Sequence, residues 1–135
     1  MYRIAIPLLC IALLMQSQAQ ATGTTLGEPT LVDANGMPIS GHINVNQKFY
    51  IATTLTHQGD TAQQFVYIVQ IADESGSTVL LKWFGGEVGP DQRLNIAVSW
   101  TPATSGTYTI DTFLWDGIHA QNALDSNKLV MASIS

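Results

Sequence analysis

Apolar and polar residues alternate with a period of two along most of the chain beyond residue 29, the pattern of β-strands that bury one face. Arg93–Trp100 shows this most clearly, since every second residue there is apolar. Clusters of Gly, Pro, Asn, Asp and Ser separate the apolar runs and favour turns. Seven strands are predicted in this way: Thr30–Ala34, Lys48–Thr56, Gln63–Asp73, Thr78–Phe84, Arg93–Trp100, Thr107–Trp115 and Lys128–Ile134. Their spacing of about ten residues, with no helical period between them, is typical of an antiparallel β-sandwich or barrel.

The alternation also predicts which side chains face the core. It places Trp100 inward, between the two sheets of a sandwich, and likewise the alternate residues that begin with Phe49, Phe65 and Tyr108 in three other strands. Thr78–Phe84 is harder to orient because both of its faces are apolar. Here Lys82 is taken to mark the solvent-facing side, which puts Phe84 outside and Trp83 inside.

A Gly-x-Tyr sequence at the start of the sixth predicted strand adds a more specific signal. In sandwich domains such a tyrosine, here Tyr108, forms a corner whose hydroxyl bonds back across the preceding crossover. The other motifs are Phe65–Ile71, Gly89–Gln92, Ser99–Pro102, Ser105–Tyr108 and Phe113–Trp115. Together they resemble the immunoglobulin-like domains of the CARDB or fibronectin type III kind, and especially those of short secreted surface proteins of archaea. The resemblance covers residues 29–135. It implies a seven-stranded antiparallel immunoglobulin-like β-sandwich with an adhesion, envelope or spacer role and no catalytic residues.

Residues 1–21 have the composition of a secretory signal peptide. Arg3 supplies the positive charge, and an uncharged apolar run of 12 residues, Ile4–Met15, follows it. This run is too short to span a membrane, which takes about 20 residues. A small-x-small sequence then predicts cleavage after Ala21, or after Ala19. We therefore predict a secreted, extracellular or cell-envelope protein whose mature chain has no membrane span.

After cleavage, residues 22–28 are predicted to form a flexible lead and residues 29–135 a single domain. The only cysteine, Cys10, leaves with the signal peptide, so the hydrophobic core has to stabilise the domain without disulfides. Hydrophobic residues make up 46% of the chain, which is enough for such a core. The chain has 10 acidic and 5 basic residues and a net charge of −5. This balance argues against nucleic-acid binding, which needs clustered Lys and Arg.

Motifs for catalysis are missing from the sequence. It contains no Gly-x-Ser-x-Gly, and no glycine-rich loop that leads from a strand into a helix to hold a phosphate. We therefore predict a protein without enzymatic activity and without a cofactor.

A metal site in the loops is an alternative. The loops after the second, fourth and sixth predicted strands are expected at one end of the sandwich. The candidate ligands are His57, Asp60, Asp116 and His119, with Glu87, Asp91 and Asp125 in the same loops. Imidazole with carboxylate suits zinc or copper, and carboxylates with carbonyls suit calcium. Charged residues also collect in loops simply because they are solvated there, and we favour that interpretation.

The predicted phases bring five apolar side chains together on the outer face of one sheet. The third, fourth and sixth strands are expected to be neighbours, and the predicted patch is Val66, Ile68, Phe84, Phe113 and Trp115. A contiguous apolar patch rimmed by carboxylates usually marks an interface. We expect it to bind another extracellular protein, a second copy of the chain, or polysaccharide.

Three alternatives to this patch remain open at this point. The loop 116–125 could fold over Trp115. Trp83, Phe84 and Trp115 could instead stack on sugar rings, which would make the domain a carbohydrate-binding module. An edge strand, or the segment 22–34, could pair with another copy by strand addition.

Overall fold

The computed structural model describes residues 23–40 and 42–135, and all regular elements within these ranges are β-strands. The predicted signal peptide lies outside the described residues. Eight strands are present: β1 (Thr24–Leu26), β2 (Thr30–Val32), β3 (Phe49–His57), β4 (Gln63–Ala72), β5 (Thr78–Val88), β6 (Arg93–Trp100), β7 (Gly106–Trp115) and β8 (Lys128–Ile134). No helix in this part of the chain is long and apolar enough to cross a membrane.

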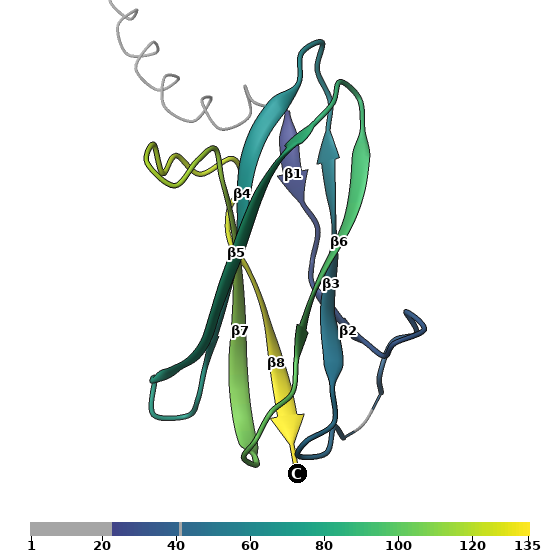
Figure 1. Cartoon of the computed structure of the whole chain (residues 1–135), viewed down its shortest axis with the longest axis vertical. Helices are drawn as coiled ribbons and strands as arrows, with labels where there is room; N and C mark the ends of the chain where they lie inside the picture. Colours follow the sequence, from purple (N-terminus) through teal and green to yellow (C-terminus); the bar gives the residue numbers. More distant parts are fainter. Residues whose placement is uncertain (1–22, 41) are drawn as a thin grey trace, which may run out of the picture.

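The strands form two antiparallel sheets packed face to face (Figure 1). One sheet has the order β5-β4-β7-β8. In the other, β6 pairs with one edge of β3, while β1 and β2 pair one after the other with its opposite edge. The predicted all-β sandwich is therefore confirmed. The third, fourth and sixth predicted strands, which are β4, β5 and β7 in the structure, are also neighbours in one sheet, as predicted.

The start of the domain differs from the prediction. Thr24–Leu26 was expected in a flexible lead, but it forms β1 and pairs with Leu55–His57 at the end of β3. Leu26 is only 2% exposed and belongs to the core. A strand of three residues carries too little alternation to be recognised in the sequence. Its backbone is ordered by pairing with β3, about 30 residues further along the chain.

The core fills the space between the two sheets. Its largest fully buried side chains come from the inward positions of β3, β4 and β7: Phe49, Ile51, Leu55, Tyr67, Val69, Ile71, Ile110 and Leu114. These are the positions that the alternation predicts. Trp100 also faces inward as predicted, but it is only half-buried, because β6 is an edge strand. Its ring packs edge-on against Phe49 and Tyr108, with centroids 5.7 and 4.9 Å away.

The predicted tyrosine corner is present. The Tyr108 hydroxyl donates a 2.7 Å hydrogen bond to the Thr104 carbonyl, which ties β7 to the crossover from β6. Gly106, at the start of β7, has φ = +145°, a conformation that favours glycine.

The predicted orientation of β5 is wrong. Tyr67 and Phe84 are register partners, and so are Ile68 and Trp83. Because Tyr67 is fully buried, Phe84 lies on the inner face of the sheet and Trp83 on the outer face. The Phe84 ring is 5.7 Å from that of Tyr67, centroid to centroid.

Lys82 led to the wrong predicted orientation because β5 is an edge strand. Its side chain leaves from the inner face, yet it reaches solvent at the open edge of the sandwich. There its Nζ donates a 2.9 Å hydrogen bond to the Ser99 carbonyl on β6, in the other sheet. An inward-facing charge of this kind is common on edge strands, where it discourages pairing with other chains.

Candidate interaction surface

An apolar groove of about 400 Å³ lies on the outer face of the β5-β4-β7-β8 sheet. Its floor is formed by Ile68 and Gln70 of β4. Leu81 and Trp83 of β5 line one side, and Phe113, Trp115 and Ile118 line the other. Two strand spacings of about 4.8 Å separate β5 from β7, so the groove is roughly 10 Å wide.

The register of the sheet builds the groove row by row. Ile68 lies between its two partners, Trp83 on β5 and Phe113 on β7. In the next row Gln70 pairs with Leu81. Trp83 and Leu81 are 57% and 52% exposed, whereas Ile68 beneath them is 8% exposed. The exposed β5 side chains therefore stand above a covered floor.

Three of the five predicted patch residues line this groove: Ile68, Phe113 and Trp115. Val66 is register partner to Trp115 and continues the same outer row at one end. Phe84 does not belong to the patch, because it points to the inner face and contacts Phe65 and Tyr67.

Sequence reasoning left Leu81, Trp83 and Ile118 out of the predicted patch, and named Trp83 only as a ring that could stack on sugars. The first two follow from the reversed orientation of β5, and only the register with β4 corrects it. Ile118 lies in the loop after β7 and carries no periodic signal.

The loop after β7 does not seal the groove. It is folded on itself: Asp116 accepts hydrogen bonds from the Asn122 backbone and side-chain nitrogens at 3.0 and 3.1 Å, and Trp115 forms a β-bridge with Ala123. Trp115 remains half-buried, and Ile118, 40% exposed, adds to the groove wall. The loop therefore extends the apolar surface.

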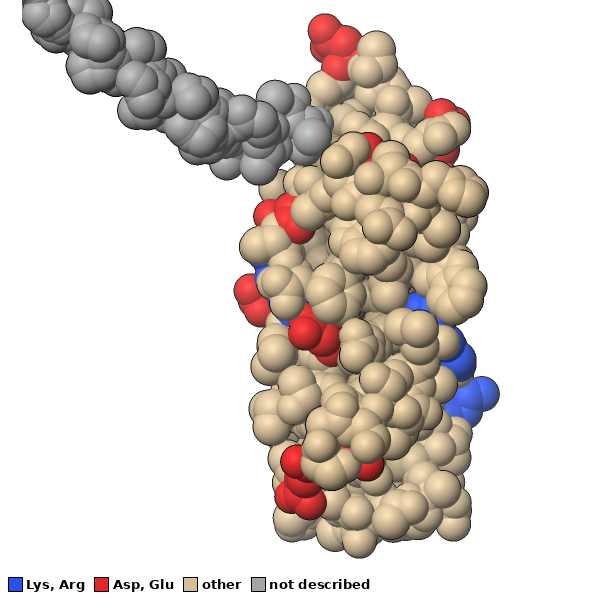
Figure 2. All heavy atoms as spheres, turned by 90° about the vertical axis from the view of Figure 1, so that its left-hand side faces the viewer, with Lys and Arg blue, Asp and Glu red and all other residues tan. Residues whose placement is uncertain are grey.

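The groove is uncharged along its whole lining. Figure 2 views the molecule from the side of this sheet and shows acidic groups at the upper end, along the left-hand side and near the lower end, basic groups mainly along the right-hand margin, and uncharged surface between them. Asp111, the β7 partner of Gln70, accepts a 2.8 Å hydrogen bond from the Asn127 side chain. The groove therefore presents an apolar surface without charged side chains.

The candidate metal ligands do not come together. Among residues 23–40 and 42–135, no group of three or more His, Cys, Asp or Glu is placed to hold a metal ion. His57 is 4% exposed, and both ring nitrogens have partners: Nδ1 lies 2.8 Å from the Thr24 hydroxyl, and Nε2 lies 2.7 Å from the Thr61 carbonyl. A carbonyl only accepts, so Nε2 is the donor, and His57 holds β1 and the β3–β4 loop in place.

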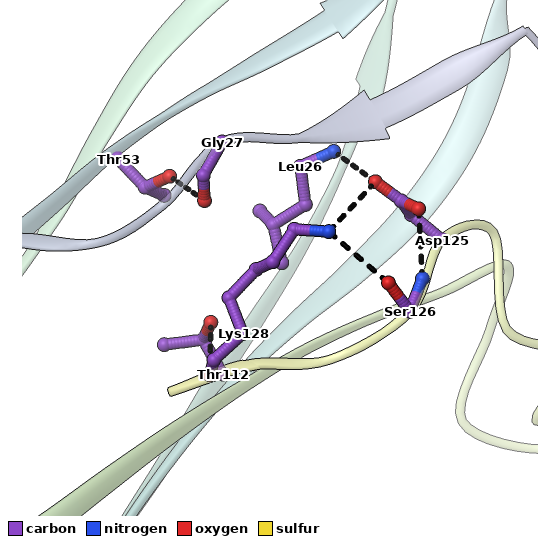
Figure 3. A network of polar contacts seen from close by, with 7 residues as sticks. All are labelled: Leu26, Gly27, Thr53, Thr112, Asp125, Ser126 and Lys128. Carbon is purple, nitrogen blue, oxygen red and sulfur yellow. Dashed lines mark hydrogen bonds and ion pairs between the residues drawn. The ribbon is translucent and has the colours of Figure 1, made fainter. Parts of the chain in front are cut away.

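Two acidic residues of the same loops, Asp125 and Asp91, have structural partners. Figure 3 shows Asp125, which accepts a 2.8 Å hydrogen bond from the Leu26 amide and another from the Ser126 amide, and pairs with Lys128 at 3.6 Å. This carboxylate links β1 to the segment before β8, and so connects the two sheets. Asp91 accepts a hydrogen bond from the Gly59 amide, which ties two loops together.

Solved structures share the architecture described above. The CARDB domain of the PF1109 protein from Pyrococcus furiosus, determined in complex with di-metal ions, superposes with a TM-score of 0.61 at 18% identity and covers 84% of this chain and 89% of that one. The 135-residue chain therefore has an immunoglobulin-like β-sandwich fold. The C-terminal domain of wzt matches with a TM-score of 0.68 at 12% identity, covering 84% and 74% of the two chains.

A β-glucosidase from Listeria innocua, determined in complex with gluconolactone, has a TM-score of 0.61 at 11% identity. The match covers 84% of this chain but 16% of that enzyme, so it concerns one domain of a larger protein. At these identities the likeness is one of fold. No protein-family model matches the sequence, and no curated protein matches it significantly.

Proposed function

We propose that this protein is a non-catalytic, secreted or cell-surface interaction module that binds another protein through the outer-face groove. The observation that carries this proposal is the exposure of Trp83, Leu81 and Ile118 around one continuous apolar groove. Isolated exposed apolar residues are common, but a contiguous apolar surface that includes tryptophan is where binding energy concentrates. The fold shared with CARDB domains is consistent with a role in which loops and sheet faces, and no catalytic centre, carry the function.

The export of the protein is part of this proposal. The Arg3 charge, the short apolar run and the small-x-small sequence at 19–21 support a cleaved signal peptide. Amino-terminal sequencing of the protein recovered outside the cell should therefore begin at Thr22, or at Gln20. A retained apolar segment, or protein found only in the cytoplasm, would contradict the export.

Carbohydrate binding is the second candidate function, because Trp83 and Trp115 both line the groove. Aromatic rings stack on sugar faces, but sugar hydroxyls also need polar partners. Gln70 is the one polar side chain in the lining, and its Nε2 already donates to the Thr78 hydroxyl at 3.1 Å. The chemistry of the groove therefore favours an apolar protein surface over a polysaccharide.

The test compares binding of the exported protein to intact cells of its source for wild type, Trp83→Ser and Trp115→Ser. Met37→Ser is the matched control, since Met37 is 61% exposed and lies outside the groove. We expect retention on cells to fall roughly tenfold or more in the tryptophan variants and to stay unchanged in the control. Competition by soluble envelope polysaccharide would support the carbohydrate alternative. Equal retention of all variants would contradict the groove as the binding site.

A further inference from the structure

We propose that the partner in the groove is a second copy of this chain, which binds face to face with two-fold symmetry. The proposal rests on the groove proposed above as the interaction site. A two-fold contact needs a surface that is complementary to itself, so each copy has to present both a projection and a matching depression.

The outer face of the sheet offers this combination on adjacent strands. Leu81 and Trp83, two residues apart on the same face of β5, form a ridge; both are more than half exposed. The depression is the groove floor on β4, next to the ridge and one strand spacing away. A two-fold axis parallel to the strands, between β4 and β5, places the ridge of each copy over the groove floor of the other.

Charge is compatible with a second copy at this face. The chain is acidic, with a net charge of −5, so two copies repel each other over long distances. No residue of the groove lining is charged, and Asp111, beside Gln70 on β7, is hydrogen-bonded by the Asn127 side chain, so the lining itself brings no like charges together. Salt screens the long-range repulsion and leaves the apolar contact intact. Self-association should therefore become stronger as the salt concentration rises.

The area available gives the expected strength. About this axis β5 and β4 of each copy overlap, a width of about 10 Å, and eight residues of strand span about 26 Å. With the relief of the large side chains and the β7 side of the groove, this amounts to roughly 400 Å² per copy, or about 800 Å² in total, which is in the range of weak, transient contacts. We therefore expect a weak dimer with a Kd of about 100 µM.

The first measurement is sedimentation equilibrium of the purified protein, expressed from the whole chain, from about 5 to about 500 µM, at low and high salt. The average mass of wild type should approach that of a dimer, sooner at high salt. Replacing the ridge by Leu81→Ser together with Trp83→Ser should weaken association roughly tenfold or more, while Met37→Ser leaves it unchanged. A mass that stays monomeric throughout, or a ridge variant that associates like wild type, would overturn the proposal.

A mixing experiment tests the ridge-in-groove geometry. Gln70→Arg places a long charged side chain on the groove floor and leaves the ridge intact. Alone, this variant and the ridge variant should both be monomeric. Mixed, they should form a heterodimer weaker than wild type, because the ridge of one still fits the groove of the other. If the mixture stays monomeric while wild type dimerises, the two copies meet in another geometry and the proposed arrangement is wrong.

The two proposals fail in different ways. A wild-type protein that is monomeric but loses binding to cells in Trp83→Ser excludes the dimer and keeps the groove as an interaction site. If the variants lose the dimer but bind cells like wild type, the second copy remains the occupant of the groove. In that case the groove is not the surface that contacts the cell.

Discussion

Two tyrosines in the sandwich should respond in opposite directions to the same chemical change. The Tyr108 hydroxyl donates to the Thr104 carbonyl at 2.7 Å. The Tyr67 hydroxyl lies in a side chain with 0% exposure and has no hydrogen-bond partner among the described residues. Replacing each tyrosine by phenylalanine removes one oxygen atom and leaves the ring.

The expected magnitudes follow from the two environments. In Tyr108→Phe the Thr104 carbonyl loses its partner at a partly buried position, which should lower the free energy of unfolding by about 1–2 kcal/mol. In Tyr67→Phe a buried hydroxyl without a partner is removed, which should raise it by about 1 kcal/mol. The small void left by the oxygen offsets this gain by only a few tenths of a kcal/mol.

Denaturant unfolding of wild type and both variants measures these differences. A single domain of this size should unfold in one transition, and 1 kcal/mol corresponds to a shift in melting temperature of roughly 4 °C. We expect Tyr67→Phe to melt above wild type and Tyr108→Phe below it. Destabilisation of Tyr67→Phe by more than about 1 kcal/mol would show that the hydroxyl has a partner, and would refute the reasoning.

The alkaline range gives an independent check on Tyr67. Burial raises the pKa of the Tyr67 phenol well above its ordinary value, so the folded state holds this proton more tightly than the unfolded state. Ionisation of Tyr67 therefore leaves the free energy of unfolding unchanged below the unfolded pKa of about 10, and lowers it as the pH rises above that value. Tyr67→Phe should lose less stability than wild type between about pH 10 and pH 12.

Three further predictions concern the core, the β4–β5 turn and metals. Trp100→Ala should lower the free energy of unfolding by about 3 kcal/mol, because Trp100 packs against Phe49 and Tyr108. Its matched control, the exposed Trp83→Ala, should lower it by less than about 1 kcal/mol in denaturant unfolding. A larger loss in Trp83→Ala than in Trp100→Ala would contradict the orientation of β5. Asp73 accepts hydrogen bonds from the Ser75 hydroxyl and from the amides of Ser77 and Ser75, and these hold the pKa of its carboxyl below the ordinary value. This stabilisation is present at neutral pH and is lost as the pH falls below about 4, so Asp73→Asn should melt below wild type at pH 7 and the difference should shrink in acid. A difference that stays constant with pH would assign the effect to another cause. Dialysis against EDTA should leave the melting temperature unchanged, since His57 uses both ring nitrogens within the fold; a clear drop would reveal a metal site that the described residues do not form.

The alternation of apolar residues was sufficient to predict most of the fold. β3, β6 and β7 each have a more polar face, so the period of two alone assigns their inward residues, and Gln70 marks the outer face of the central strand β4. Phe49 and Leu114 are buried as this period predicts. The Gly-x-Tyr sequence likewise predicted the bond between Tyr108 and Thr104, because that corner depends on local geometry.

The candidate site depended on information that the sequence does not contain. Both faces of β5 are apolar, so its orientation is decided only by the register with β4, in which Trp83 meets Ile68 and Phe84 meets Tyr67. Lys82 pointed to the wrong face because a long side chain at a sheet edge can leave the core side and still reach water.

The same distinction explains the remaining differences. β1 exists because β3 and Asp125 hold its backbone, and both contacts join segments far apart in the chain. The histidine and the carboxylates that suggested a metal site form no metal-binding group among residues 23–40 and 42–135, and His57 and Asp91 contact other parts of the fold instead. Strand positions follow from local periodicity, which one segment carries alone, whereas the groove, the ridge and the end of the sandwich arise from contacts between segments, which only the folded chain brings together.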